Sequence, residues 1–160
     1  MNALKTAAHL KLDWQDEALL CIGIGNSGRG DDGLGWAFLE RLENWTGFKG
    51  QCHYCYQLQV EDAALIAPCA TVLFIDAARD RLPDGFGLFD CSPAIQFSFS
   101  THELSPESIL FLAADLYQKS PPAYVLAISG VDWELGQGLS HLGAAHLEKA
   151  WQSLTATADV

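Results

Sequence analysis

Two carboxylates and one imidazole in this chain stand where a metal ion could be held. Asp32 follows an apolar run and a glycine-rich loop, Asp76 ends a second apolar run, and His102 lies in a loop just before a helix start. Carboxylate oxygens and an imidazole nitrogen together suit a divalent transition metal. Taken singly, Asp32 can cap a helix, Asp76 can cap a turn, and His102 can serve as a loop hydrogen-bond partner. Their chemistry therefore depends on whether the fold brings them to one place.

The elements that must position these side chains alternate between strand and helix. Serine caps at Ser105, which is followed by proline, and at Ser140 mark two helix starts. Such alternation predicts a mainly parallel sheet with helices on both faces, in which ligands bind beyond the carboxyl ends of the strands. All three candidates then share one edge of the sheet. The expected strands are 18–24, 51–58, 71–75, an edge strand at 86–89, and 123–129; the expected helices are 32–45, 61–67, 105–117 and 140–154.

Length and composition limit the class of protein. The 160 residues suggest one domain, and the net charge of −11 argues against nucleic acid and anionic membranes as partners. No apolar run approaches the roughly 20 residues of a membrane span, and no secretion signal is seen. Five cysteines, an odd number, fit reduced thiols in a cytoplasmic protein, and the size favours a monomer. Cys52 and Cys55 form C-x-x-C, but on a strand they point to opposite faces.

A dinucleotide fingerprint is the alternative interpretation of the first loop. Gly23, Gly25 and Gly28 match G-x-G-x-x-G, the pattern in which a helix opens onto a pyrophosphate. Here the chain continues Arg-Gly-Asp-Asp-Gly, which is too rich in glycine and polar residues for a first helical turn, and the adjacent carboxylates would repel a phosphate. The acidic residue expected at the end of the next strand is also missing. A nucleotide-binding enzyme stays the less favoured alternative.

The chain resembles the hydrogenase maturation endopeptidases through four motifs in order. The first is the G-x-G-N…D-D-x-x-G stretch of residues 23–35, and the second is Phe74-Ile75-Asp76-Ala77. The third is His102-Glu103-Leu104, and the fourth is Gly136-Gln137-Gly138-Leu139-Ser140. The resemblance covers residues 18 to 155, so we expect a single domain over 1–160, with 1–17 as an N-terminal extension. It implies a three-layer α/β/α sandwich with a mainly parallel central sheet, phosphorylase/hydrolase-like.

The resemblance also implies an activity. Members of this family remove a C-terminal extension from the large-subunit precursor of a [NiFe]-hydrogenase after nickel insertion. Their metal-contacting trio maps onto Asp32, Asp76 and His102 and senses the nickel of the precursor, so no permanent cofactor is expected. Either the metal or a carboxylate, Asp31 or Asp32, can activate the attacking water. Competing hypotheses are a scaffold that binds nickel and precursor without cutting, and a hydrolase with its own zinc.

One segment departs from the pattern of some members. Where they carry Asp-Gly-Gly-Thr after the second strand, this chain has Gln57-Leu58-Gln59-Val60-Glu61-Asp62. It resembles a branch with a Gln-Leu-x-x-Glu pattern. We expect Gln57 and Glu61, together with Asn26 of the G-x-G-N motif, to contact the substrate.

Overall fold

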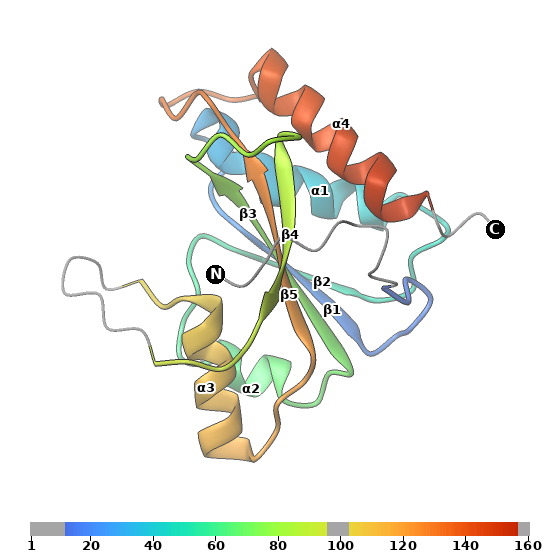
Figure 1. Cartoon of the computed structure of the whole chain (residues 1–160), viewed down its shortest axis with the longest axis vertical. Helices are drawn as coiled ribbons and strands as arrows, with labels where there is room; N and C mark the ends of the chain where they lie inside the picture. Colours follow the sequence, from blue (N-terminus) through green and yellow to red (C-terminus); the bar gives the residue numbers. More distant parts are fainter. Residues whose placement is uncertain (1–11, 96–102, 157–160) are drawn as a thin grey trace.

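A five-stranded sheet forms the centre of the computed structural model, which describes residues 12–95 and 103–156 (Figure 1). The strands lie in the order β2-β1-β3-β5-β4, and all neighbours are parallel except β4 with β5. The mainly parallel sheet and the edge position of the strand near residue 86 are confirmed. The strands are β1 (Leu19–Ile24), β2 (Gln51–Cys55), β3 (Thr71–Ala78), β4 (Phe86–Cys91) and β5 (Ala123–Ser129).

Helices cover both faces of the sheet, which makes the three layers expected from the sequence (Figure 1). On one face, α1 (Leu34–Glu43) and α4 (His141–Thr155) pack against the sheet around Phe38, Leu73 and Leu126. On the other, α2 (Asp62–Ile66) and α3 (Pro106–Tyr117) pack around Ile66, Phe74 and Ile109. Because β1 and residues 72–75 of β3 are buried on both sides, these stretches are continuously apolar.

The C-x-x-C pair follows the alternation of its strand. Cys52 packs against the core beneath α1 and α4, whereas Cys55 packs against the core beneath α2 and α3. Both thiols are free. The expectation that these side chains point to opposite faces is confirmed, so they cannot bind one metal together.

Several boundaries differ from those expected, and three of them bear on the functional edge of the sheet. A short 3-10 helix over Gly30–Gly33 precedes α1, which begins at Leu34 rather than at residue 32, because the glycine-rich segment does not support an α-helical turn. Strand β2 ends at Cys55 rather than at residue 58. Strand β3 continues through Asp76, because this residue still pairs in register with Ile24 on one side and Ala127 on the other. The predicted caps at Ser105 and Ser140 are confirmed, since each side chain accepts a backbone hydrogen bond three residues ahead.

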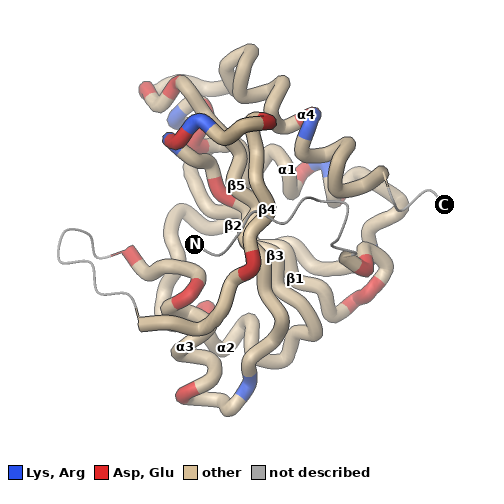
Figure 2. Tube along the Cα trace, in the orientation of Figure 1, with Lys and Arg blue, Asp and Glu red and all other residues tan. Residues whose placement is uncertain are grey.

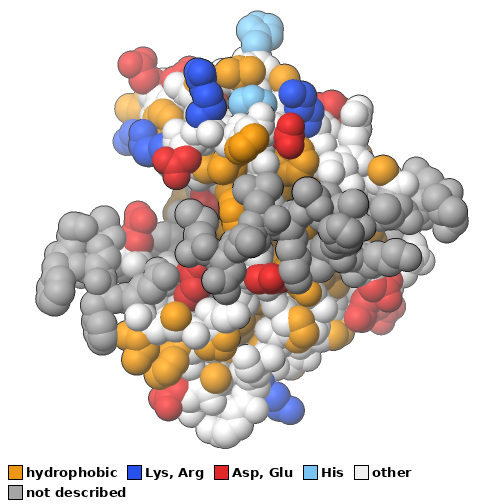
Figure 3. Space-filling view, viewed as in Figure 1, with side chains coloured by type: hydrophobic (Ala, Val, Ile, Leu, Met, Phe, Trp, Pro, Cys, Tyr) orange, Lys and Arg blue, Asp and Glu red, His pale blue; other side chains and the backbone are white. Residues whose placement is uncertain are grey.

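Charge is unevenly spread over the described part of the molecule. Figure 2 shows acidic positions near both ends of the sheet, with few basic ones. On the face drawn in Figure 3, most of the basic side chains gather in the upper half, near α4 and the β3–β4 connection. None of the described helices has the length and apolar character needed to cross a membrane.

The close approach of α1 to the sheet depends on Gly35. A Cβ at this position would lie 2.5 Å from the carbonyl oxygen of Ile75 and 3.0 Å from that of Ile24. Both oxygens belong to strand backbone, so the added methyl group could be accommodated only by moving α1 away from β1 and β3.

We predict that Gly35→Ala lowers the free energy of unfolding by about 1–3 kcal/mol, as overpacking does in other cores. Denaturant titration measures it. The control is Gly28→Ala, whose Cβ would meet only the side-chain oxygen of Asn26, at 3.2 Å. Equal stability of the two variants would contradict this account of α1 packing.

Candidate functional site

An acidic pocket opens at the carboxyl ends of β1 and β3. The sheet order places β2 on one side of β1 and β3 on the other, so the connections that leave β1 and β2 pass to opposite faces and leave a crevice at this edge. A pocket of about 180 Å³ occupies it. Its lining residues are Ile24, Gly25, Asp32, Tyr56, Gln57, Leu58, Asp76, Glu103, Leu104 and Pro106.

Asp76 is the most perturbed carboxyl group of the pocket. It lies on β3, directly opposite Ile24 in the β1–β3 pairing. Burial raises the pKa of Asp76 to about 7, and the negative charges of Asp32 and Glu103 act in the same direction. Its ionisation is therefore opposed by its surroundings, and a cation in the pocket would favour it.

Asp32 reaches the same pocket from the 3-10 helix that follows β1. Burial raises the pKa of Asp32 and the charge of Glu103 adds to this, while Arg79, Arg29 and the backbone of Asn26 oppose it. The fold thus brings two sequence-predicted ligands into one cavity. Oxygen donors with unfavourable ionisation form a set that a divalent cation would stabilise.

His102 lies outside the described residues, so its place in the metal trio stays a prediction. The two residues that follow it, Glu103 and Leu104, line the pocket. Within residues 12–95 and 103–156, no group of three or more His, Cys, Asp and Glu side chains is placed to hold a metal ion.

The three residues expected to contact substrate have different environments. Gln57 lines the pocket. Glu61 is exposed at the start of α2 and is not part of the lining. The side-chain oxygen of Asn26 accepts a hydrogen bond from the backbone N–H of Gly28, 2.8 Å away, so this side chain is used within its own loop. Substrate contact by any of them stays a prediction.

Two further residues that line the pocket are not predicted from the sequence. Tyr56, 69% exposed, follows β2 and stacks on Trp36 with ring centroids 5.4 Å apart. Glu103 contributes a third carboxylate. The sequence signals that point to them are weak: one directly follows a strand, and the other is next to His102.

Asp31, the neighbour of Asp32, is fully buried and is not part of the pocket lining. Its carboxylate accepts backbone hydrogen bonds from Val131 at 2.8 Å, Asp132 at 3.1 Å and Ser140 at 2.8 Å. The Ser140 hydroxyl donates a fourth, at 2.7 Å. Burial would raise the pKa of Asp31, but these hydrogen bonds outweigh it and lower the pKa. The geometry favours an anchoring role over the activation of water.

We predict that Asp31→Asn lowers the free energy of unfolding at about pH 7 by about 2–4 kcal/mol, because an amide presents its own N–H groups to donors. The lowered pKa of the native carboxyl means that its stabilisation is present above the ordinary value of 3.8 and is lost as pH falls through the native pKa. Denaturant titrations should therefore show the gap between wild type and variant narrowing at about pH 3. Asp115→Asn, an exposed carboxylate on α3, is the control. A constant gap would refute the anchoring account.

We predict that Asp76→Asn raises the free energy of unfolding of the metal-free protein, the opposite of the effect of Asp31→Asn. The pKa raised from 3.8 to about 7 means that ionisation destabilises the native state progressively between these two values. At about pH 8 the variant should be more stable than wild type, by on the order of a few kcal/mol, and near pH 4 the two should converge. Thermal melting at both pH values measures this. Asp80→Asn, exposed beyond the same strand, should change stability at neither pH.

Solved structures of hydrogenase maturation proteases are similar to this chain. HycI of Thermococcus kodakarensis, a [NiFe] hydrogenase maturation protease, matches with a TM-score of 0.62 and 22% identity over 88% of this chain and 90% of that one. The hydrogenase maturating endopeptidase HybD of E. coli matches with a TM-score of 0.63 and 17% identity over 87% and 90%. The [NiFe] hydrogenase maturation protease HybD of T. kodakarensis matches with a TM-score of 0.59 and 21% identity over 88% of this chain and 98% of that one.

No family model matches the sequence, and no curated protein sequence does either. At these identities the structural likeness concerns the fold. The chain has the α/β/α fold of the [NiFe]-hydrogenase maturation proteases, as its four sequence motifs implied.

Proposed function

We propose that this protein is an endopeptidase that removes the C-terminal extension of a [NiFe]-hydrogenase large-subunit precursor after nickel has been inserted. In this proposal Asp32, Asp76 and His102 recognise the nickel that the precursor carries. The observation that carries it is the convergence of Asp32 and Asp76 in one pocket at the β1–β3 crevice.

Two features support the proposal. The four family motifs occur in order along the chain, and two of them supply the pocket carboxylates. The fold is shared with proteins described as hydrogenase maturation proteases, over most of both chains.

The electrostatics of the pocket give a physical basis for a nickel checkpoint. A precursor that carries nickel brings a cation to carboxylates whose ionisation is otherwise disfavoured, whereas a metal-free precursor brings none. Occupancy of the metal site is then expressed as a difference in affinity between the two forms of the substrate. Asp76 must lose its proton to contact the metal, which couples binding to pH.

The peptide bond would be attacked by water close to this contact. The substrate's nickel can polarise the carbonyl or acidify the water, or Asp32, one of the three described pocket carboxylates, can act as a base in place of contacting the metal. Asp31 is less suited to this task, because four donors already occupy its carboxylate. We further propose that the protein acts in the cytoplasm as a monomer, without a cofactor of its own.

We predict that wild-type protein cleaves nickel-loaded precursor and not nickel-free precursor, at a rate that rises as pH passes through about 7, the pKa of Asp76. Asp76→Ala and His102→Ala should each slow cleavage by at least about a hundredfold, the scale of a lost electrostatic contact in a transition state. Intact mass spectrometry of the precursor follows the release of the C-terminal peptide.

Asp80→Asn, which lies just beyond the pocket strand, is the matched control and should cleave at the wild-type rate. Cleavage by Asp76→Ala at that rate would overturn the nickel-recognition proposal. Binding of loaded precursor without cleavage would support a scaffold instead, and failure both to bind and to cleave would reject the proposed function.

A further inference from the structure

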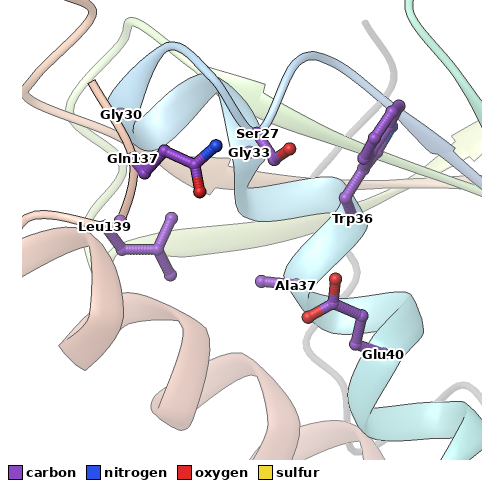
Figure 4. A pocket seen from close by; sticks show the side chains of 9 residues that line it. Ser27, Gly30, Gly33, Trp36, Ala37, Glu40, Gln137 and Leu139 are labelled. Atoms are coloured by element: carbon purple, nitrogen blue, oxygen red, sulfur yellow. The ribbon is translucent and has the colours of Figure 1, made fainter.

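A second groove lies beside the acidic pocket and is not used by the chemistry described above. It has a volume of about 170 Å³ and runs between the start of α1 and the segment before α4 (Figure 4). In Figure 4, Glu40 and Ala37 project from α1, and Gln137 extends its amide toward Ser27 across the groove. The lining residues are Ser27, Gly30, Gly33, Trp36, Ala37, Glu40, Gln137, Gly138 and Leu139.

The groove and the acidic pocket lie on two sides of one loop. Asp32 lines the pocket, and the next residue, Gly33, lines the groove. A stacked aromatic pair makes a second link, because Trp36 lines the groove and Tyr56 lines the pocket. The stacked pair thus forms the boundary between the pocket and the groove.

The walls of the groove are held together before any ligand arrives. The backbone N–H of Gly30 donates to the carbonyl of Gly136 at 3.0 Å, and the N–H of Gly136 donates to the carbonyl of Gly28 at 2.9 Å. Asp31 adds the hydrogen bonds that join the loop after β1 to Ser140. A preformed groove loses little conformational entropy of its own when a ligand binds.

The surface of the groove suits an extended peptide. Gly138 leaves exposed backbone along it, whereas Gly30 and Gly33 are buried and form its floor. Ser27 and Gln137 are exposed, and within the described part of the chain neither side chain has a hydrogen-bond partner, so both can pair with the amide groups of a bound strand.

Charge indicates what the bound strand carries. Glu40 is exposed, it forms no salt bridge with any described residue, and no Lys or Arg lines the groove. Its neighbour Arg41 is already paired with Glu148. An uncompensated carboxylate beside a peptide channel attracts a cationic side chain and repels an acidic one.

We propose that this groove binds an extended segment of the substrate polypeptide, with a basic side chain of that segment against Glu40, while the acidic pocket contacts the metal. The inference rests on the proposed function and identifies the surface that would hold the substrate beyond its metal. Glu40 is then a specificity determinant that acts on binding and leaves the chemical step unchanged.

The test is the steady-state cleavage of nickel-loaded large-subunit precursor by Glu40→Gln and Glu40→Lys. We expect KM to rise roughly threefold for Glu40→Gln and at least about tenfold for Glu40→Lys, with kcat unchanged, because only uniform binding is lost. The effect should weaken at high salt, since the interaction is between exposed charges. Because Glu40 is exposed, thermal melting should match wild type and show that folding is intact.

Asp115→Lys is the matched control, because it reverses an exposed carboxylate on α3, on the other face of the sheet, and should leave both constants unchanged. If wild type cleaves and the Glu40 variants keep its KM, or if Asp115→Lys raises KM equally, the groove proposal is overturned while the proposed function stands. If wild type neither binds nor cleaves the precursor, both fail together.

Discussion

A buried carboxylate ties the functional edge of this molecule together. Asp31 has no exposed surface and accepts four hydrogen bonds from a segment about a hundred residues further along the chain. Together with the backbone hydrogen bonds between Gly30 and Gly136 and between Gly136 and Gly28, it joins the loop after β1 to the segment before α4. Since Asp32 is the next residue, the same anchor fixes where the neighbouring carboxylate enters the pocket. The two adjacent aspartates thus have different roles: Asp31 is bound within the structure, and Asp32 lines the pocket.

Asp32 belongs to a site in which burial and neighbouring negative charges disfavour the ionised carboxylates. Asp32 and Asp76 both have raised pKa values, and Glu103 contributes to each shift. A protein that needed only stability would place amides there. Carboxylates that lower stability in this way are expected where a cation binds during function, because the cation offsets the repulsion between their negative charges.

Most of the fold could be predicted from the sequence, because local signals and tertiary structure agree. The apolar runs of β1 and β3 reflect burial on both faces, and Ser105 and Ser140 cap their helices as their neighbours indicated. Helix α1 begins two residues later than predicted, since the pattern of apolar positions does not show where a 3-10 turn gives way to an α-helix.

The site was only partly predictable. Asp32 follows the first strand and Asp76 ends the third, and the carboxyl ends of parallel strands meet at one edge, so the meeting of Asp32 and Asp76 was foreseeable. The different environments of Asp31 and Asp32 could not be predicted, because they depend on a contact between Asp31 and Ser140 that no local sequence pattern reveals. Tyr56 escapes prediction for a similar reason: its stacking on Trp36 joins two elements that sequence spacing does not relate.

The protonation of the Cys55 thiol bears on how tightly a metal ion could be held at this edge of the sheet. Burial raises the pKa of Cys55 to about 12, with the charges of Asp62 and Asp76 adding to the shift, so it remains a neutral thiol. Thiolates are the ligands that would compete best for a soft or borderline ion already held by sulfur. Cys55 is also not part of the described lining of the pocket, whose side-chain donors are the oxygens of Asp32, Asp76, Glu103, Gln57 and Tyr56. On the proposed function, such a surface can bind the nickel of the precursor weakly and then release the processed large subunit with its nickel still in place.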